Sequence, residues 1–118
     1  MQRKFILTGA LMAMLSVVIG AFGAHMLEPI VGESAMKVYE TGVQYHMAHA
    51  LGIILIGVVA GLWGDSRKLV WAGWLLLAGI ILFSGSLYVL AISGIKVLGA
   101  ITPLGGVAFI IGWICLIA

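Results

Sequence analysis

The stretch LVWAGWLLLAGIILFSGSLYVLAI, which spans residues 69–92, decides the fold of this chain. None of its side chains is charged at neutral pH. A helix needs about 20 mostly apolar residues to cross a hydrocarbon core of roughly 30 Å. The stretch meets that requirement without a break and therefore predicts a membrane-spanning helix.

Three further stretches, residues 5–24, 45–63 and 97–118, have the same apolar character. The 118-residue chain is 64% hydrophobic and 8% charged, whereas about 25% of an average soluble domain is charged. These features predict an all-α fold with one domain, residues 1–118, built as an integral membrane bundle of four transmembrane helices. In the last span, Thr102-Pro103 predicts a kink, with residues 97–101 sharing the crossing.

The first span and the segment after it each allow two interpretations. A basic start followed by an apolar run and small residues also resembles a secretory signal, but we expect a retained helix. Residues 34–44 form either a short interfacial helix between the first two spans or an extension of the second span. Met36, Tyr39 and Val43 share one helical face in both cases.

Basic residues are divided unevenly between the two ends of the predicted bundle. Four lie at one end and two at the other: Arg3, Lys4, Arg67 and Lys68 against Lys37 and Lys96. Short loops rich in Lys and Arg stay in the cytoplasm, so we expect both termini there. A net charge of +2 offers no basic patch for nucleic acid. The predicted partner is the lipid bilayer.

Small residues recur at helical spacing along the first and third spans. Helix association inside a bilayer depends on close backbone approach, which small side chains permit. The predicted helix-packing residues are Gly9, Ala13, Ser16, Gly20, Gly23, Gly79 and Ser86. Because the chain has 17 glycines for only four crossings, we also expect a homo-oligomer.

Polar side chains are few inside the predicted spans. No Asp, Glu, Lys or Arg lies deep in any of them, which disfavours a proton-coupled antiporter built on a buried carboxylate. The four Trp residues are interpreted as an aromatic belt at the span ends. The remaining polar residues form a candidate cluster near the outer membrane surface: His25, Tyr45, His46, His49, Ser84, Tyr88 and Thr102. We expect the three histidines at similar depth.

Three uses of this cluster stay open. Three imidazoles could bind zinc, a hydrogen-bonded network would hold the helices together, and a histidine could respond to protons or contact a ligand. We favour the network and predict neither a metal nor a cofactor. The sequence has no nucleophile elbow, phosphate loop or dinucleotide fingerprint, so we do not expect an enzyme.

Four short motifs occur in an order that resembles a known family. They are GAFGAH at residues 20–25, HALG at 49–52, FSGSLY at 83–88 and ITPLGG at 101–106. Together they are similar to the small bacterial membrane family called domain of unknown function 423. The resemblance implies a four-helix protein of the bacterial cytoplasmic membrane, and it implies no reaction and no catalytic residue.

Two kinds of function remain open from the sequence. The packing seams and the lack of buried charges favour a structural or interaction protein that forms an oligomeric helix bundle. The alternative is a small channel or transporter for a neutral or anionic solute, lined by His25, His49, Ser84 and Tyr88.

Overall fold

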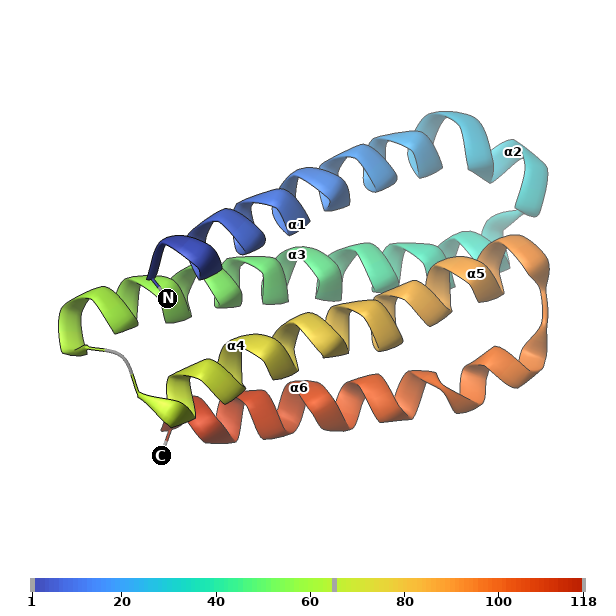
Figure 1. The fold of residues 1–118 in the computed structure, drawn as a ribbon. Helices are drawn as coiled ribbons and strands as arrows, with labels where there is room; N and C mark the ends of the chain where they lie inside the picture. Colours follow the sequence, from blue (N-terminus) through green and yellow to red (C-terminus); the bar gives the residue numbers. More distant parts are fainter. Residues whose placement is uncertain (1, 65, 118) are drawn as a thin grey trace.

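The chain folds as an antiparallel bundle of four helical spans (Figure 1). The computed structural model describes residues 2–64 and 66–117, and these contain no strand. The predicted all-α membrane bundle is therefore confirmed. Its elements in chain order are α1 (Gln2–Phe22), the π-helix η1 (Gly23–Leu27), α2 (Glu28–Val31), α3 (Glu33–Trp63), α4 (Arg67–Gly79), the π-helix η2 (Ile80–Ser84), α5 (Gly85–Ser93), the 3₁₀-helix η3 (Lys96–Ala100) and α6 (Thr102–Ile117).

Four continuous stretches are long and apolar enough to cross a bilayer. They are Gln2–Val31, Glu33–Trp63, Arg67–Ser93 and Lys96–Ile117. Residues 1 and 118, the predicted limits of the domain, lie outside the described part of the chain.

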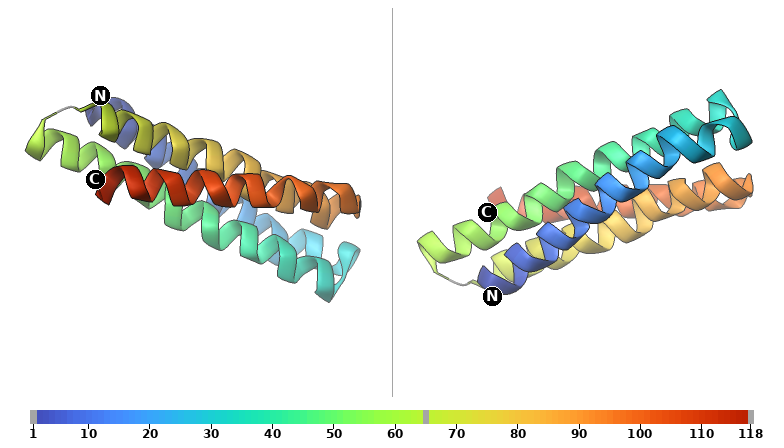
Figure 2. Two further views of the ribbon diagram at one scale, coloured as in Figure 1. Left: turned by 90° about the horizontal axis from the view of Figure 1, so that it is seen from below. Right: turned by 90° about the horizontal axis from the view of Figure 1, so that it is seen from above.

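The two termini lie at one end of the bundle, together with the connection between α3 and α4 (Figure 1). α3 is the central helix because it packs against α1, α4 and α5, while α6 packs against α4 and η2. Figure 2 shows that α1 runs at an angle to α4 and approaches it near the N-terminus. The bundle is 47 Å long, close to the roughly 40–45 Å between the two headgroup regions of a bilayer.

The second span is longer than the predicted residues 45–63, because α3 begins at Glu33. Gly32 separates α2 from α3 with a φ of 89°, a conformation that a side chain would strain. Of the two alternatives for residues 34–44, the structure has the extension of the second span. The short helix between the first two spans is α2, which has 4 residues and lies before this segment.

The fourth span begins as the 3₁₀-helix η3 and becomes α-helical at Thr102. Pro103 is thus the second residue of α6, where its missing N–H breaks no helical hydrogen bond. The structure has a change of helix type at Thr102-Pro103, the position of the predicted kink. The span nevertheless includes residues 97–101, as expected.

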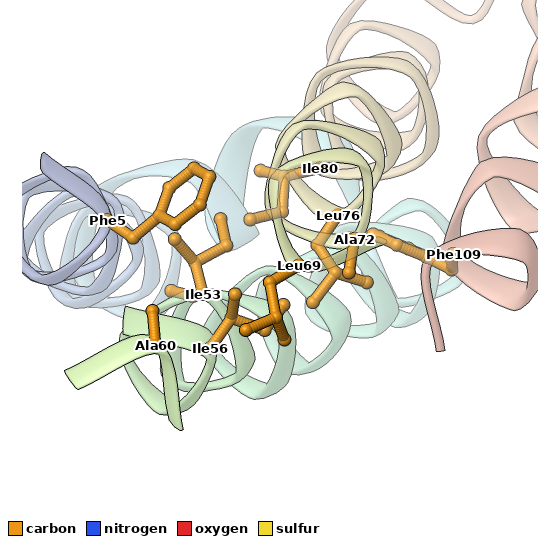
Figure 3. Close-up of a cluster of buried hydrophobic side chains, with 10 residues drawn as sticks. Phe5, Ile53, Ile56, Ala60, Leu69, Ala72, Leu76, Ile80 and Phe109 are labelled. Carbon is orange, nitrogen blue, oxygen red and sulfur yellow. The ribbon is translucent and has the colours of Figure 1, made fainter. Parts of the chain in front are cut away.

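The largest buried cluster joins all four spans. α3 and α4 supply most of its side chains, while α1 adds Phe5 and α6 adds Phe109 (Figure 3). Each of these two rings rests on a glycine of α4. A Cβ added at Gly73 would lie 2.4 Å from the Phe5 ring, and one at Gly79 would lie 2.3 Å from the Phe109 ring. Both outer helices can approach α4 closely because these two positions have no side chain.

The small residues of α1, continued by Gly23 of η1, face α3 along most of the length of α1. A Cβ at Gly9 would lie 2.7 Å from the carbonyl oxygen of Ala50, and one at Gly23 would lie 2.2 Å from the Tyr39 ring. Ala13, Ser16 and Gly20 lie between these two points. α1 and α3 are therefore in contact at backbone distance, which is the arrangement that small residues permit in a membrane.

Adjacent glycines of α6 allow a matched test of this close packing. A Cβ at Gly105 would lie 2.3 Å from the backbone nitrogen of Phe83, whereas one at Gly106 would meet no neighbouring atom nearer than 3.9 Å. We expect Gly105→Ala to destabilise the bundle by about 1–3 kcal/mol, because backbone must move to admit the methyl group. Gly106→Ala should leave the stability unchanged or raise it, since alanine favours a helix.

Reversible unfolding of the purified protein in mixed micelles measures both variants. Equal destabilisation of the two would contradict the close contact between α6 and η2.

Candidate functional site

Buried polar side chains gather around the middle of the bundle. In the part of the chain that the structure describes they are Ser16, His46, His49, Ser84 and Ser86. The midpoint of α3 (Glu33–Trp63) falls between the two histidines. We call these five residues, together with Tyr88, Thr102 and Trp113, which bond to them, the polar layer. It lies where a bilayer has no water to offer a polar group.

His25 lies away from the polar layer. It is exposed on η1, and the neighbouring Gly23 packs against Tyr39 of α3. That contact places His25 roughly 15 Å along the helix axis from the levels of His46 and His49, at 1.5 Å a residue. The predicted common depth near the outer surface is therefore wrong. The reason is that the turn falls at Gly32, so a long first part of α3 precedes His46.

His49 makes two hydrogen bonds that fix its proton. Its Nδ1 lies 2.8 Å from the carbonyl oxygen of Tyr45, which can only accept, so Nδ1 carries the hydrogen. Its Nε2 lies 3.0 Å from Nε1 of Trp113, which can only donate, so Nε2 has none. The ring also stacks on Phe109 with centroids 3.6 Å apart. His49 is thus a neutral imidazole that joins α3 to α6.

His46 joins α3 to α5. Its Nδ1 lies 2.8 Å from the Tyr88 hydroxyl oxygen, while its buried Nε2 has no hydrogen-bond partner among residues 2–64 and 66–117. One turn before Tyr88, the fully buried Ser84 donates to the carbonyl oxygen of Gly42 at 2.7 Å. Gly42 also lets the Tyr88 ring lie directly on the α3 backbone. Ser84 and Tyr88 therefore bind the same face of α3.

The remaining bonds tie the other helix pairs together. Ser86 and Thr102 share a hydrogen bond of 2.6 Å between their hydroxyl oxygens, which links α5 to α6. Ser16 donates to the Met47 sulfur at 3.6 Å, which links α1 to α3. Ser84 is the last residue of η2, and such a π-helical turn shifts the residues that follow it relative to a regular α-helix. Each buried polar side chain of the polar layer thus bonds to a second helix.

The arrangement gives no support to a zinc site. Among residues 2–64 and 66–117, no group of three or more His, Cys, Asp or Glu is placed to hold a metal ion. Both nitrogens of His49 already have partners, and His25 is distant from it. Tyr45, the remaining member of the predicted cluster, is 43% exposed and packs its ring against Phe83 with centroids 4.6 Å apart.

Three functional contacts of the polar layer were missed by the sequence reasoning. Trp113 was interpreted as part of an aromatic belt, yet it bonds to His49. Phe109 covers the same imidazole, and the carbonyl of Gly42 accepts the bond from Ser84. The spacing of Gly105, Phe109, Gly112 and Trp113 along one face of α6 was the available signal.

The bonds of His49 predict its tautomer. Nitrogen chemical shifts of ¹⁵N-labelled histidine in lipid should show a neutral His49 ring with its hydrogen on Nδ1. In Trp113→Phe the indole donor is lost, so the His49 signals should shift, while those of the exposed His25 serve as the internal control. A His49 ring with its hydrogen on Nε2 would contradict the bond to Trp113.

The bond between His46 and Tyr88 predicts a measurable coupling. A double-mutant cycle of His46→Leu and Tyr88→Phe, followed by reversible unfolding in micelles, should give a coupling free energy of about 1 kcal/mol, within the range found for buried hydrogen bonds between membrane helices. The control cycle pairs Tyr88→Phe with Ser93→Ala, whose hydroxyl donates to the carbonyl oxygen of Val89 and accepts from the backbone N–H of Ile95, and so makes no bond to Tyr88. This control cycle should give no coupling free energy. A His46–Tyr88 coupling no larger than the control would show that this bond contributes no stability.

Comparison with known proteins places the chain among uncharacterised membrane proteins. A family described as "Protein of unknown function (DUF423)" matches residues 19–106. The UPF0382 membrane protein YwdK of Bacillus subtilis (strain 168) is 53% identical over 116 residues, which cover 98% of this chain and 94% of that protein. A UPF0382 membrane protein of Staphylococcus haemolyticus (strain JCSC1435) is 54% identical, with 98% and 93% covered. No solved structure gives a significant match.

Proposed function

This chain belongs to the DUF423 family of membrane proteins, and we propose that it is a non-catalytic interaction protein whose four-helix bundle assembles with further copies of itself in a bacterial membrane. The observation that carries the proposal is the amide of Gln44, which is exposed within the membrane-spanning part of α3 and has no hydrogen-bond partner among residues 2–64 and 66–117.

Gln44 lies in a shallow groove between α1 and α3. The groove has a volume of about 670 Å³ and is lined by Ser16, Val17, Gly20, Ala21, Val43, Gln44, Met47 and Ala48. Apart from Gln44 and the buried Ser16, the lining is apolar, and three of its residues are Gly or Ala. Gln44 lies four residues from the midpoint of α3, or about 6 Å along the helix. With the midpoint of α3 taken as the centre of the bilayer, its amide lies within the hydrocarbon core of about 30 Å.

An amide in that position needs a partner that lipid cannot supply. Each unsatisfied polar group in hydrocarbon costs several kcal/mol. Among residues 2–64 and 66–117 the Gln44 amide has no hydrogen-bond partner. A second copy supplies one, since a primary amide both donates and accepts and can pair with its own symmetry mate across a two-fold axis. The small neighbours Gly20, Ala21 and Ala48 would let the two backbones approach.

The interior of the bundle supports this role over that of a channel or transporter. A polar path needs side chains that are free to solvate a solute, whereas each buried polar side chain of the polar layer bonds to a second helix. Among residues 2–64 and 66–117, the buried Nε2 of His46 is the one such side-chain atom without a partner. The groove at Gln44 lies between only two helices, α1 and α3, and it opens to one side of the bundle. We place both termini in the cytoplasm, because Arg3, Lys4, Arg67 and Lys68 gather at their end.

Disulfide cross-linking in membranes tests the proposed interface. In a Cys115→Ala background, Ala48→Cys should cross-link to a dimer, because Ala48 is exposed in the groove beside Gln44. Adding Gln44→Leu should weaken self-association roughly tenfold, the effect of losing one interhelical amide pair of about 1–2 kcal/mol. Gln44→Asn, which keeps the amide, should restore much of the cross-linking.

The control is Val107→Cys in the same background, since Val107 is exposed on α6, away from the groove. It should stay monomeric under the same oxidation. Absence of a dimer with Ala48→Cys, or equal cross-linking at both positions, would overturn the proposed interface. A solute flux into proteoliposomes that Tyr88→Phe abolishes would favour the transporter instead.

A further inference from the structure

A second groove opens on the other side of α3, between α3 and α6. Its volume is about 380 Å³, and aromatic rings make up most of its wall: Tyr45, His49, Phe83, Phe109 and Trp113. Gly106 and Ile110 complete the lining. The ring planes of Tyr45, His49 and Phe109 lie within 18° of one another. His49 and Phe109 stack face to face, so the groove presents a wall of aromatic ring faces and edges.

The groove contains one hydrogen-bond donor without a partner. Tyr45 is 43% exposed, and its hydroxyl makes no hydrogen bond to residues 2–64 and 66–117. Tyr45 lies three residues from the midpoint of α3, or about 5 Å along the helix, so this hydroxyl is inside the hydrocarbon core. The other polar groups of the wall are already used, because His49 and Trp113 bond to each other.

We propose that this groove binds the ring of a membrane-soluble carbonyl compound of the quinone class, with Tyr45 donating to the carbonyl oxygen. The depth of the groove restricts its occupant to molecules dissolved in the lipid. A wall made mostly of aromatic rings favours a planar ring, which packs on their faces or edges in an offset or edge-to-face arrangement. A carbonyl oxygen satisfies the Tyr45 hydroxyl, which the acyl chain of a lipid cannot do.

The chain offers a reporter at the groove. Trp113 lines it, whereas Trp63, Trp71 and Trp74 do not. In a variant with these three replaced by Phe, Trp113 is the sole tryptophan. A benzoquinone with a decyl tail, titrated into phosphatidylcholine nanodiscs that hold this variant, should quench the Trp113 fluorescence to saturation at one site, because quinones quench an indole on contact.

Two further substitutions link the quenching to the groove. Tyr45→Phe keeps the ring and removes the hydroxyl, so binding should weaken about fivefold, as expected for one hydrogen bond. Gly106→Leu should abolish saturable quenching, since a Cβ at Gly106 has free space and a longer side chain would occupy the groove. The matched control Val107→Leu lies next to it on α6 outside the groove and should bind as the parent does.

Three results would overturn the proposal. Quenching that rises linearly with quinone and never saturates would show partition into lipid only. Saturation unchanged in Gly106→Leu would place the quinone elsewhere. Saturable quenching by a fatty acid brominated at mid-chain, but not by the quinone, would assign the groove to an acyl chain. The test is independent of self-association, because Gln44→Leu should leave the quenching unchanged.

Discussion

The structure depends on one constraint, which is that a polar group inside a bilayer must find its hydrogen-bond partner within the protein. In water, an unpaired imidazole or hydroxyl on one helix would be solvated. At the middle of this bundle, His46, His49 and Ser84 bond instead to a neighbouring helix. These bonds act between α3 and its partners, so they fix how far each helix slides and turns against the central one. The apolar contacts around them are far less directional.

Glycine makes those bonds reachable. A hydroxyl on one helix reaches a carbonyl on the next only if the two backbones are close, as Ser84 and Gly42 are. Because Gly42 has no side chain, the Tyr88 ring can lie on α3 and reach His46. Gly79 and Gly105 do the same for α6, whose Phe109 and Trp113 then meet His49. Small residues and polar residues are thus two parts of one packing arrangement, and the loss of either part would weaken the other.

The sequence predicted those features that depend on neighbouring residues. The four spans follow from local hydrophobicity, and the small seam of α1 follows from helical spacing. Features that depend on how one helix packs against another could not be predicted from local sequence. The predicted depth of His46 and His49 was wrong, because this depth depends on where the chain turns between the first two spans. The turn is at Gly32 and not at the edge of the apolar stretch. The Trp113 bond to His49 joins residues 64 positions apart, and no spacing rule reaches that far.

α3 contacts each of the other spans, and this explains why both proposed surfaces begin on it. Gln44 and Tyr45 are consecutive and so point about 100° apart around the helix. One faces the groove beside α1 and the other faces the groove beside α6. In the remaining, wider arc around the helix, His46 and His49 point inward to Tyr88 and Trp113. A change in the angle of α3 against α6 would strain the His49 bond and reshape the aromatic groove together. Occupancy of that groove would therefore bear on the packing of α3 against α6.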